Sequence, residues 1–256
     1  MAYGVIGVGA IGSAIVTGLS DDVDDAPEVL LSPRNAEIAA GLAQRFETVD
    51  VAADNQAVVD GAQVVLVCVR PADASSVLAG VRFPADRTVL SAVAGVQIET
   101  LQPLVAPATD IARVIPLPAV ARRDGITPIH PPNPAAAALF DRLGETVELT
   151  DVDAFDAFAA ATATFAAHFR YLSTIAEWLT ATGIPGSAGT HYVASSFAGL
   201  AESTRGAASF DELAREFATP GGLNEQLLEE LEDAGIYEDL RAALDGIIDR
   251  LRGAGR

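Results

Sequence analysis

The chain has 256 residues, enough for one large domain or two small ones, and half of them are hydrophobic. Its formal net charge of −19 excludes the basic surface that a nucleic-acid-binding protein needs. Its apolar runs fall short of the ~18 residues that span a bilayer, and its first residues lack the basic region of a secretory leader. We therefore expect a cytoplasmic protein with neither a nucleic-acid partner nor a membrane association.

Two further features of the composition limit the chemistry. The single cysteine, Cys68, excludes a disulfide within the chain, and the three histidines are too scattered to suggest a metal site, so we expect no metal. All sixteen basic residues are arginines. The lack of lysine excludes any mechanism that needs an ammonium acid or a Schiff base.

Short apolar runs alternate with helical patterns as far as residue 150. The predicted strands cover residues 3–8, 28–31, 49–51, 64–69, 88–94, 111–116, 125–130 and 146–149. The predicted helices between them cover residues 13–19, 35–46, 55–60, 72–80 and 134–143. Strands alternating with helices at this spacing predict an α/β domain with a mostly parallel, doubly wound sheet.

The pattern changes after residue 150. A long helical pattern rich in alanine and aromatic residues covers residues 153–183, and further helices are predicted over 186–203 and 209–217. The sequence TPGG at 219–222 breaks the helical pattern, and two more helices complete the chain. We therefore predict a Rossmann-type domain over residues 1–150 and an all-α domain over 151–256. Its strongly apolar helices favour dimerisation or a higher homo-oligomer.

A glycine motif lies between the first predicted strand and the first predicted helix. Its residues run Gly7, Val8, Gly9, Ala10, Ile11 and Gly12. In this position the first glycine permits a tight turn, the second lets the backbone approach a pyrophosphate, and the third allows the helix to pack closely on the strand. The N-terminal amides of the helix then face the anion. The motif predicts a dinucleotide site that includes Ala10 and Ile11.

The end of the second predicted strand indicates which dinucleotide is bound. It carries Ser32, Pro33, Arg34 and Asn35, with no carboxylate to accept a hydrogen bond from a ribose 2′-hydroxyl. Arg34 can pair with the 2′-phosphate of NADP, and Ser32 and Asn35 can hydrogen-bond to it. We predict NADP as the cofactor. The alternative is that Arg34 is only a solvated loop charge.

Two more strand ends face the same crevice in a sheet of this kind. Val69, Arg70 and Pro71 end one buried strand, and Arg70 can face either the cofactor or solvent. The small residues Ala94 and Gly95 lie at the end of the next strand. We expect a nicotinamide ring to lie against the backbone there, although ordinary packing explains the small residues equally well.

These pieces together resemble the pyrroline-5-carboxylate reductase family. The matching stretches are GVGAIGSAIVTGL, SPRN, VCVRP, SAVAGV, ARVIPLPAV and TPGG, in the family's order and along nearly the full length. The resemblance implies an NADP-binding Rossmann domain followed by a helical dimerisation domain. It also implies reduction of the cyclic imine 1-pyrroline-5-carboxylate to proline, with hydride passing from the nicotinamide to the imine carbon.

The resemblance also implies where the small carboxylate substrate binds. The sequence from Arg113 resembles the family's RxMPN loop, so Pro116 and Leu117 are expected beside the substrate, with Leu117 in place of the family's asparagine. The segment 219–224 resembles the family's SPGGTT loop, which binds the substrate carboxylate. It supplies the expected substrate-binding residues Thr219, Gly221, Gly222 and Leu223, and the polar side chain of Asn224.

The predicted substrate pocket therefore departs from the family where the cofactor motifs do not. Where the family has a small-residue SGSGPAY segment, this chain has Phe165, His168 and Arg170. His168 can donate a proton near neutral pH, and with Asn224 it is a candidate catalytic residue. Arg170 can hold a carboxylate. A helix-surface position for His168 and a solvated ion pair for Arg170 are the alternatives.

Three hypotheses follow for the activity. The first is an imine reductase acting on pyrroline-5-carboxylate. The second is a reductase of another small imine or keto acid, with His168 or Tyr192 as the proton donor. The third is a non-catalytic protein that binds NADP. The β-hydroxyacid dehydrogenases share the broad architecture, but they need a lysine acid that this chain lacks.

Overall fold

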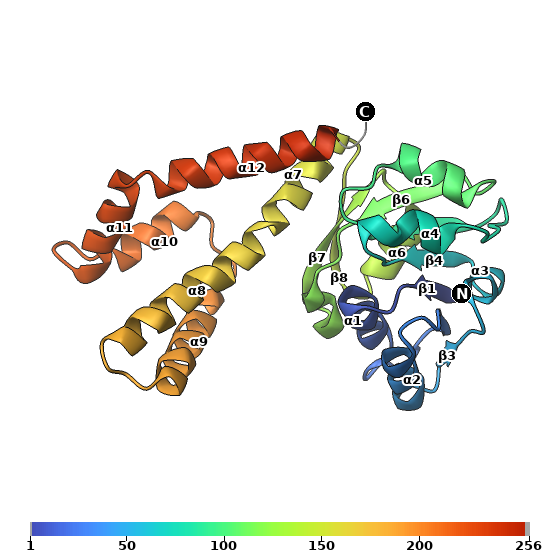
Figure 1. Ribbon diagram of the computed structural model, residues 1–256, viewed down its shortest axis with the longest axis horizontal. Coiled ribbons are helices and arrows are strands. Elements are labelled where there is room, and N and C mark those ends of the chain that lie inside the picture. The colour runs from blue at the N-terminus through green and yellow to red at the C-terminus, as the bar shows by residue number, and fades with distance from the viewer. Residues whose placement is uncertain (1, 254–256) are drawn as a thin grey trace. The chain divides into compact units, whose positions relative to one another are not determined.

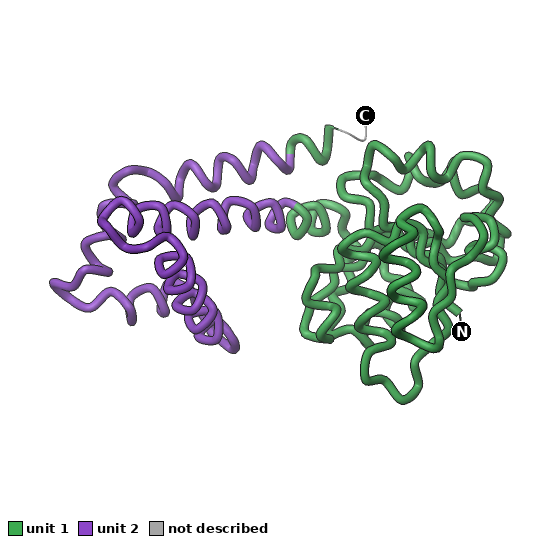
Figure 2. Tube along the Cα trace, turned by 60° about the horizontal axis from the view of Figure 1, so that its bottom comes forward, with its two compact units in different colours: residues 1–159, 249–256 green, residues 160–248 purple. Residues whose placement is uncertain are grey.

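A computed structural model describes residues 2–253. The described chain forms two compact units (Figure 2). The first, the sheet unit, contains residues up to 159 together with the stretch from residue 249 onwards. The second, the helical unit, contains residues 160–248.

The sheet unit is built on an eight-stranded sheet (Figure 1). Its strands are β1 (Tyr3–Ile6), β2 (Val29–Leu31), β3 (Val49–Val51), β4 (Val64–Val67), β5 (Thr88–Ser91), β6 (Asp110–Val114), β7 (Gly125–His130) and β8 (Gly144–Glu148). Their order is β3-β2-β1-β4-β5-β6-β7-β8, and only the pairing of β6 with β7 is antiparallel. The predicted mostly parallel, doubly wound sheet is confirmed, since its first six strands have the order of a dinucleotide-binding fold.

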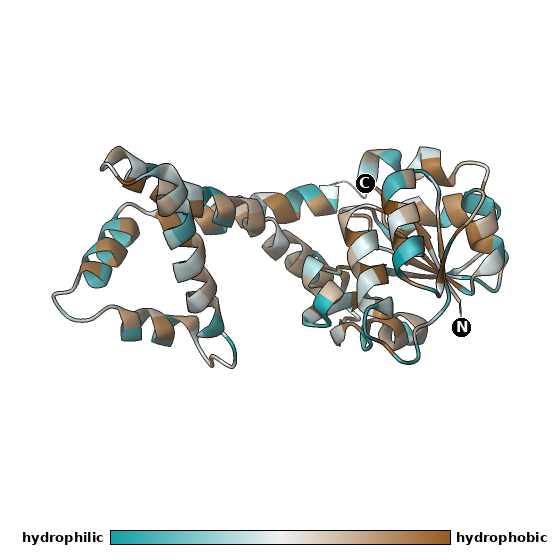
Figure 3. Ribbon diagram, turned by 90° about the horizontal axis from the view of Figure 1, so that it is seen from below, coloured by the Kyte–Doolittle hydropathy of each residue, from teal (hydrophilic) through white to brown (hydrophobic). Residues whose placement is uncertain are grey.

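Helices cover both faces of this sheet (Figure 1). They are α1 (Ala10–Ser20), α2 (Ala36–Arg45), α3 (Asn55–Gly61), α4 (Ala74–Leu78), α5 (Ile98–Val105) and α6 (Pro134–Phe140), with 3₁₀ turns at Pro71–Asp73 and Pro118–Arg122. Neighbouring residues of each strand alternate between two hydrophobic cores. In β1, Val5 packs in the core beneath α1, α2 and α6, while Ile6 packs in the core beneath α3, α4 and α5. The neighbouring strands β2, β1 and β4 are accordingly apolar along their length, and the sheet is coloured mostly as hydrophobic in Figure 3.

The remaining helices are α7 (Val152–Thr162), α8 (Thr164–Ala181), α9 (Gly186–Glu202), α10 (Phe210–Phe217), α11 (Leu223–Asp233) and α12 (Ile236–Gly253). Most of α7 and the last turn of α12 belong to the sheet unit. The helical unit leaves large aromatic side chains exposed, among them Phe169, Trp178 and Tyr192. No helix among the described residues is long and apolar enough to cross a membrane.

Several predicted boundaries differ from the structure. The predicted helix over 153–183 is two helices that meet at residue 163. Helix α1 begins at Ala10 rather than at residue 13, because the chain already enters the helix from the extended backbone of Gly9. Helix α5 was missed by the sequence analysis, and it contains Pro103, which the periodicity argument treats as a breaker.

Candidate active site

The glycine turn between β1 and α1 forms the centre of the candidate site. Gly7 has a φ of +98°, a left-handed conformation that favours glycine. A Cβ added to Gly12 would lie 2.5 Å from the carbonyl oxygen of Gly7, so only glycine lets α1 pack this closely on the turn. A Cβ added to Gly9 would meet no atom within 4 Å. The side of Gly9 on which a side chain would stand is therefore open.

Two polar side chains hold this turn in place. The amide of Gly7 donates a 3.0 Å hydrogen bond to the Ser32 hydroxyl, and the side-chain amide of Asn35 donates one of 3.0 Å to the carbonyl of Val8. The Ser32 side chain is buried. We expected the Ser32 hydroxyl to hydrogen-bond the 2′-phosphate. The structure contradicts this expectation, because the hydroxyl is buried and accepts a hydrogen bond from the glycine turn instead. Asn35 lies at the surface and remains within reach of a ligand.

A groove of about 290 Å³ lies beside the turn. Its walls come from three segments of the sheet unit, and it is lined by Gly7, Val8, Gly9, Arg34, Asn35, Val69, Arg70 and Asp73. The structure thus brings together the glycine motif, the end of β2 and the end of β4 at one groove, as the sequence analysis expected of strand ends that face the same crevice. Pro71 opens the short 3₁₀ turn that carries Asp73.

An ion cluster borders this groove. The Asp73 carboxylate accepts hydrogen bonds from Arg70 at 2.9 Å and lies 3.6 Å from a guanidinium nitrogen of Arg34. The side chain of Arg34 is 63% exposed and that of Arg70 is 80% exposed, whereas that of Asp73 is only 22% exposed. Asp73 was missed by the sequence analysis. Its helical position three residues after Arg70 is the signal that predicts their pairing.

The loop after β5 lies at the same edge of the sheet. Ser91, the last residue of β5, is in register with Val67 at the end of β4, which in turn pairs with Ile6 at the end of β1. The segment with Ala94 and Gly95 therefore leaves the sheet beside the glycine turn. Gly95 has a φ of +70° and Ala94 is exposed.

Arg113 ends buried in the sheet unit. Its side chain is 3% exposed and pairs at 2.9 Å with the equally buried Asp156 of α7. The guanidinium also donates a 2.7 Å hydrogen bond to Gln97 and lies 4.5 Å above the ring of Phe155. Arg113 therefore does not face a ligand. Pro116 is buried after it and Leu117 is half-buried.

The predicted substrate loop belongs to the helical unit, at the start of α11. The amide of Gly221 donates a 2.6 Å hydrogen bond to the Glu225 carboxylate, and the amide of Gly222 donates to the Thr219 carbonyl at 2.8 Å. Both amides therefore already have partners within the loop, which corrects the expectation that they are open to the substrate carboxylate. The side-chain amide of Asn224 donates to the Phe217 carbonyl at 3.1 Å. Leu223 is almost fully exposed.

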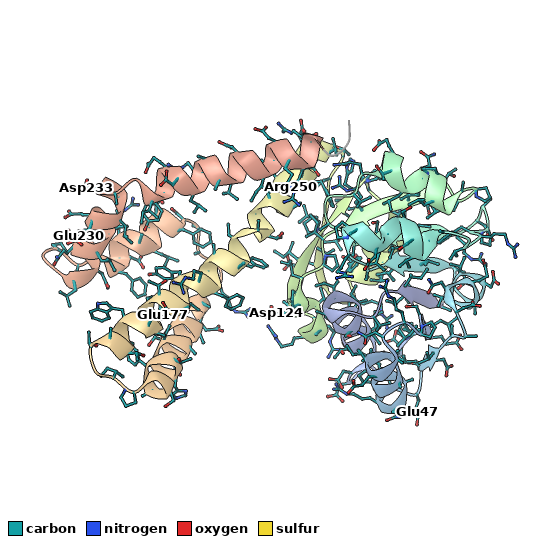
Figure 4. The ribbon with its side chains drawn as sticks, in the orientation of Figure 1. Glu47, Asp124, Glu177, Glu230, Asp233 and Arg250 are labelled. Atoms are coloured by element: carbon teal, nitrogen blue, oxygen red, sulfur yellow. The ribbon has the colours of Figure 1, made fainter. Side chains whose placement is uncertain are left out.

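The remaining candidates lie on α8. His168 is exposed, with its ring centroid 5.9 Å from that of Phe169. Arg170 donates a 2.7 Å hydrogen bond to Glu177, the acidic residue labelled on α8 in Figure 4. This hydrogen bond, with a second one from Ser173, lowers the pKa of the Glu177 carboxyl. Arg170 thus takes the solvated ion pair that the sequence analysis gave as the alternative.

Comparison with known proteins identifies the family. Residues 2–95 match a family model described as NADP oxidoreductase, coenzyme F420-dependent. Residues 151–253 match the model described as pyrroline-5-carboxylate reductase dimerisation. A pyrroline-5-carboxylate reductase of Corynebacterium melassecola is 24% identical over 98% of this chain and 98% of its own length. These matches, which cover both halves of the chain, support the pyrroline-5-carboxylate reductase family. They bear out the resemblance expected from the sequence motifs.

Other relatives span the chain in the same way. Pyrroline-5-carboxylate reductase 3 of Xenopus laevis is 25% identical over 100% of this chain and 97% of its own length. The crystal structure of 1-pyrroline-5-carboxylate reductase from Streptococcus pyogenes has a TM-score of 0.81 at 24% identity, covering 99% of this chain and 98% of that one. The likeness extends over both predicted domains, so the family's fold is present in full.

Proposed function

We propose that this protein is an NADPH-dependent reductase of a cyclic imine, 1-pyrroline-5-carboxylate, which it converts to proline. One observation carries the proposal. The groove lined by the glycine turn and two arginines lies at the carboxyl edge of a dinucleotide-binding sheet, in a chain whose second half matches the family's dimerisation model. The named relatives in Corynebacterium melassecola and Xenopus laevis carry this activity in their names.

The residues at the groove fit NADP. The open backbone at Gly9 leaves space for a pyrophosphate, and the first amides of α1, from Ala10, Ile11 and Gly12, have no acceptor within the helix. The guanidiniums of Arg34 and Arg70 would bind the 2′-phosphate, as charge-assisted and bidentate donors do. A crystal structure of the Plasmodium falciparum reductase, with a TM-score of 0.79 at 17% identity, has NADP bound.

The reduction needs orientation more than acid–base chemistry. When bound, NADPH supplies the hydride that forms the new C–H bond at the imine carbon. The segment with Ala94 and Gly95 would support the nicotinamide ring, and Pro116 and Leu117 would border the substrate. His168 would donate the proton that keeps the imine nitrogen in its iminium form. Transfer of hydride to this cation gives a neutral amine, so no further proton is needed.

The substrate carboxylate would bind at the 219–224 loop. To do so it would take the place of the Glu225 carboxylate at the Gly221 amide, beside Thr219 and Gly222. Leu223 and Asn224 would then provide one apolar and one polar contact. Because a carboxylate already occupies this amide, a second candidate is a reductase of an imine that lacks the carboxylate.

The same proposal includes a homodimer in the cytoplasm. The support for a dimer is the matched dimerisation model and the exposed aromatic side chains of the helical unit, including Phe169 and Trp178. A domain boundary at residue 150, between a 1–150 cofactor domain and a 151–256 dimerisation domain, remains part of the proposal. Sedimentation would test the dimer, and cell fractionation would test the location.

The decisive test is a substrate panel. Purified protein is mixed with NADPH and either pyrroline-5-carboxylate or 1-pyrroline, the same ring without the carboxylate, and proline or pyrrolidine is measured. The proposal expects faster turnover of pyrroline-5-carboxylate. Faster turnover of 1-pyrroline supports the second candidate. If NADPH binds and neither imine reacts, both candidates fail, and a different imine or keto acid, or a non-catalytic NADP-binding protein, is favoured.

The role of His168 has its own test. His168→Asn should lower kcat on the order of 100-fold if His168 supplies the proton. The matched control is His191→Asn, which replaces a histidine of the neighbouring helix α9 in the same unit. An unchanged rate for His168→Asn would leave this residue as a surface histidine.

A further inference from the structure

Gln97 lies at the start of a helix but does not cap it. It is the N-cap residue of α5, a place where short polar side chains normally accept a hydrogen bond from the first turn of the helix. Its side chain makes no such bond. Instead its side-chain carbonyl oxygen accepts a 2.7 Å hydrogen bond from Arg113 of strand β6. The side chain of Gln97 therefore links elements rather than capping its own helix.

The partner of Gln97 is held rigidly. The Arg113 guanidinium is fixed by the Asp156 carboxylate at 2.9 Å and by the ring of Phe155, both of α7. Arg113 and Asp156 are each 3% exposed. Separating a buried ion pair leaves an uncompensated charge and strongly destabilises the fold. The folded protein therefore keeps Arg113 and Asp156 in one arrangement. The position of Gln97 is set by this arrangement.

Gln97 also ends the loop that leaves β5. The loop contains Ala94 and Gly95, and a Cβ added to Gly95 would lie 3.4 Å from the Leu251 side chain in the last turn of α12. The side-chain amide of Gln97 donates a longer hydrogen bond, of 3.4 Å, to the Leu251 carbonyl. The loop is thus tied to β6 and α7 through Arg113, and it rests on the last turn of α12.

We propose that Gln97 is a positioning residue for hydride transfer: through Arg113 and Asp156 it fixes the 92–97 loop that supports the nicotinamide ring. The inference rests on the proposed function, since it assumes that this loop lies beside the ring. Hydride transfer depends on the distance between the donor and acceptor carbons, and a misplacement of ~1 Å costs about 100-fold in rate. The 2′-phosphate contacts of Arg34 and Arg70 lie on other segments, so cofactor affinity depends little on Gln97.

The experiment uses Gln97→Met, which keeps the length of the side chain and removes both hydrogen bonds. We expect kcat to fall about 10- to 100-fold while the Kd for NADPH changes less than about threefold. Gln97→Glu keeps an oxygen that accepts from Arg113 and should retain kcat within about threefold. The control is Gln56→Met, because Gln56 also joins two segments, with hydrogen bonds to both the amide and the carbonyl of Arg82.

In an active protein, two outcomes overturn the proposal. Either Gln97→Met keeps the parent kcat, or it loses kcat and NADPH affinity together to the same extent as Gln56→Met, as general destabilisation would cause. If the parent protein reduces neither imine, the proposed function fails by itself. The attachment of the 92–97 loop through Gln97 is then tested by hydrogen exchange at the amide of Val96, which donates to the Val93 carbonyl. If the Val96 amide exchanges about tenfold faster in Gln97→Met than in Gln56→Met, Gln97 holds the loop in place; equal rates overturn this role.

Discussion

Arg34 offers the sharpest test of how the cofactor is recognised. Its guanidinium borders the groove and lies 3.6 Å from the Asp73 carboxylate, with 63% of the side chain exposed. The perturbation is Arg34→Ala. It removes a cation that would contact the 2′-phosphate of NADP, whereas NAD has no phosphate there. The two cofactors should therefore respond differently to the same substitution.

The magnitude follows from the exposure of the site. A hydrogen bond to a charged group contributes about 1.5–3 kcal/mol when well formed. Solvent screening of an exposed arginine favours the lower end of that range. Since about 1.4 kcal/mol is a factor of ten, we expect NADPH to bind roughly tenfold more weakly to Arg34→Ala. The affinity for NADH should change less than about twofold on the same scale.

The assay is a fluorescence titration of the parent and the variant with NADPH and NADH, at low and moderate salt. Arg45→Ala is the control, because Arg45 is an exposed arginine on α2 that pairs with Asp21 and does not line the groove. Its affinity for both cofactors should match the parent. Equal weakening of NADPH and NADH by Arg34→Ala would refute the assignment of the 2′-phosphate to this arginine.

Three further substitutions test other parts of the account. Asp73→Asn removes a negative charge beside the expected 2′-phosphate, so NADPH should bind about two- to fivefold more tightly, and weaker binding would show that Asp73 mainly orders the arginines. Gly12→Ala places a Cβ 2.5 Å from the Gly7 carbonyl oxygen. Urea unfolding should show a loss of about 1–3 kcal/mol in the free energy of unfolding, and the variant should no longer bind NADPH. A fully active variant would contradict the packing argument. Asp156→Ala leaves Arg113 buried without its counter-ion and should cost about 3–5 kcal/mol of unfolding free energy. The exposed Asp153 is the matched control, and a similar cost for Asp153→Ala would contradict the role of burial.

The sequence predicted those parts of the fold that depend on local patterns. Continuous apolar runs such as VVLV mark strands that are buried on both faces, and Gly7 and Gly12 mark the turn because only glycine fits there. Helix α5 escaped prediction because Pro103 interrupts its pattern. The break between α7 and α8 near residue 163 was also missed, because no glycine or proline marks it in the sequence.

The candidate site was harder to predict because its side chains meet through the tertiary fold. Nothing local to Ser32 shows that its hydroxyl accepts from Gly7 rather than facing solvent. Arg113 could be placed at a strand end, but its burial against Asp156 depends on how α7 packs, 43 residues further along the chain. The hydrogen bond between Gly221 and Glu225 likewise requires the loop to be in its folded geometry.

Transfer of deuterium tests the central claim most directly. The purified protein is incubated with pyrroline-5-carboxylate and NADPH deuterated at both C4 positions of the nicotinamide, and the product is examined by mass spectrometry and NMR. We predict proline carrying one deuterium, on the former imine carbon. Proline without deuterium, or no proline at all under conditions where NADPH binds, would contradict the assignment of the protein as an imine reductase.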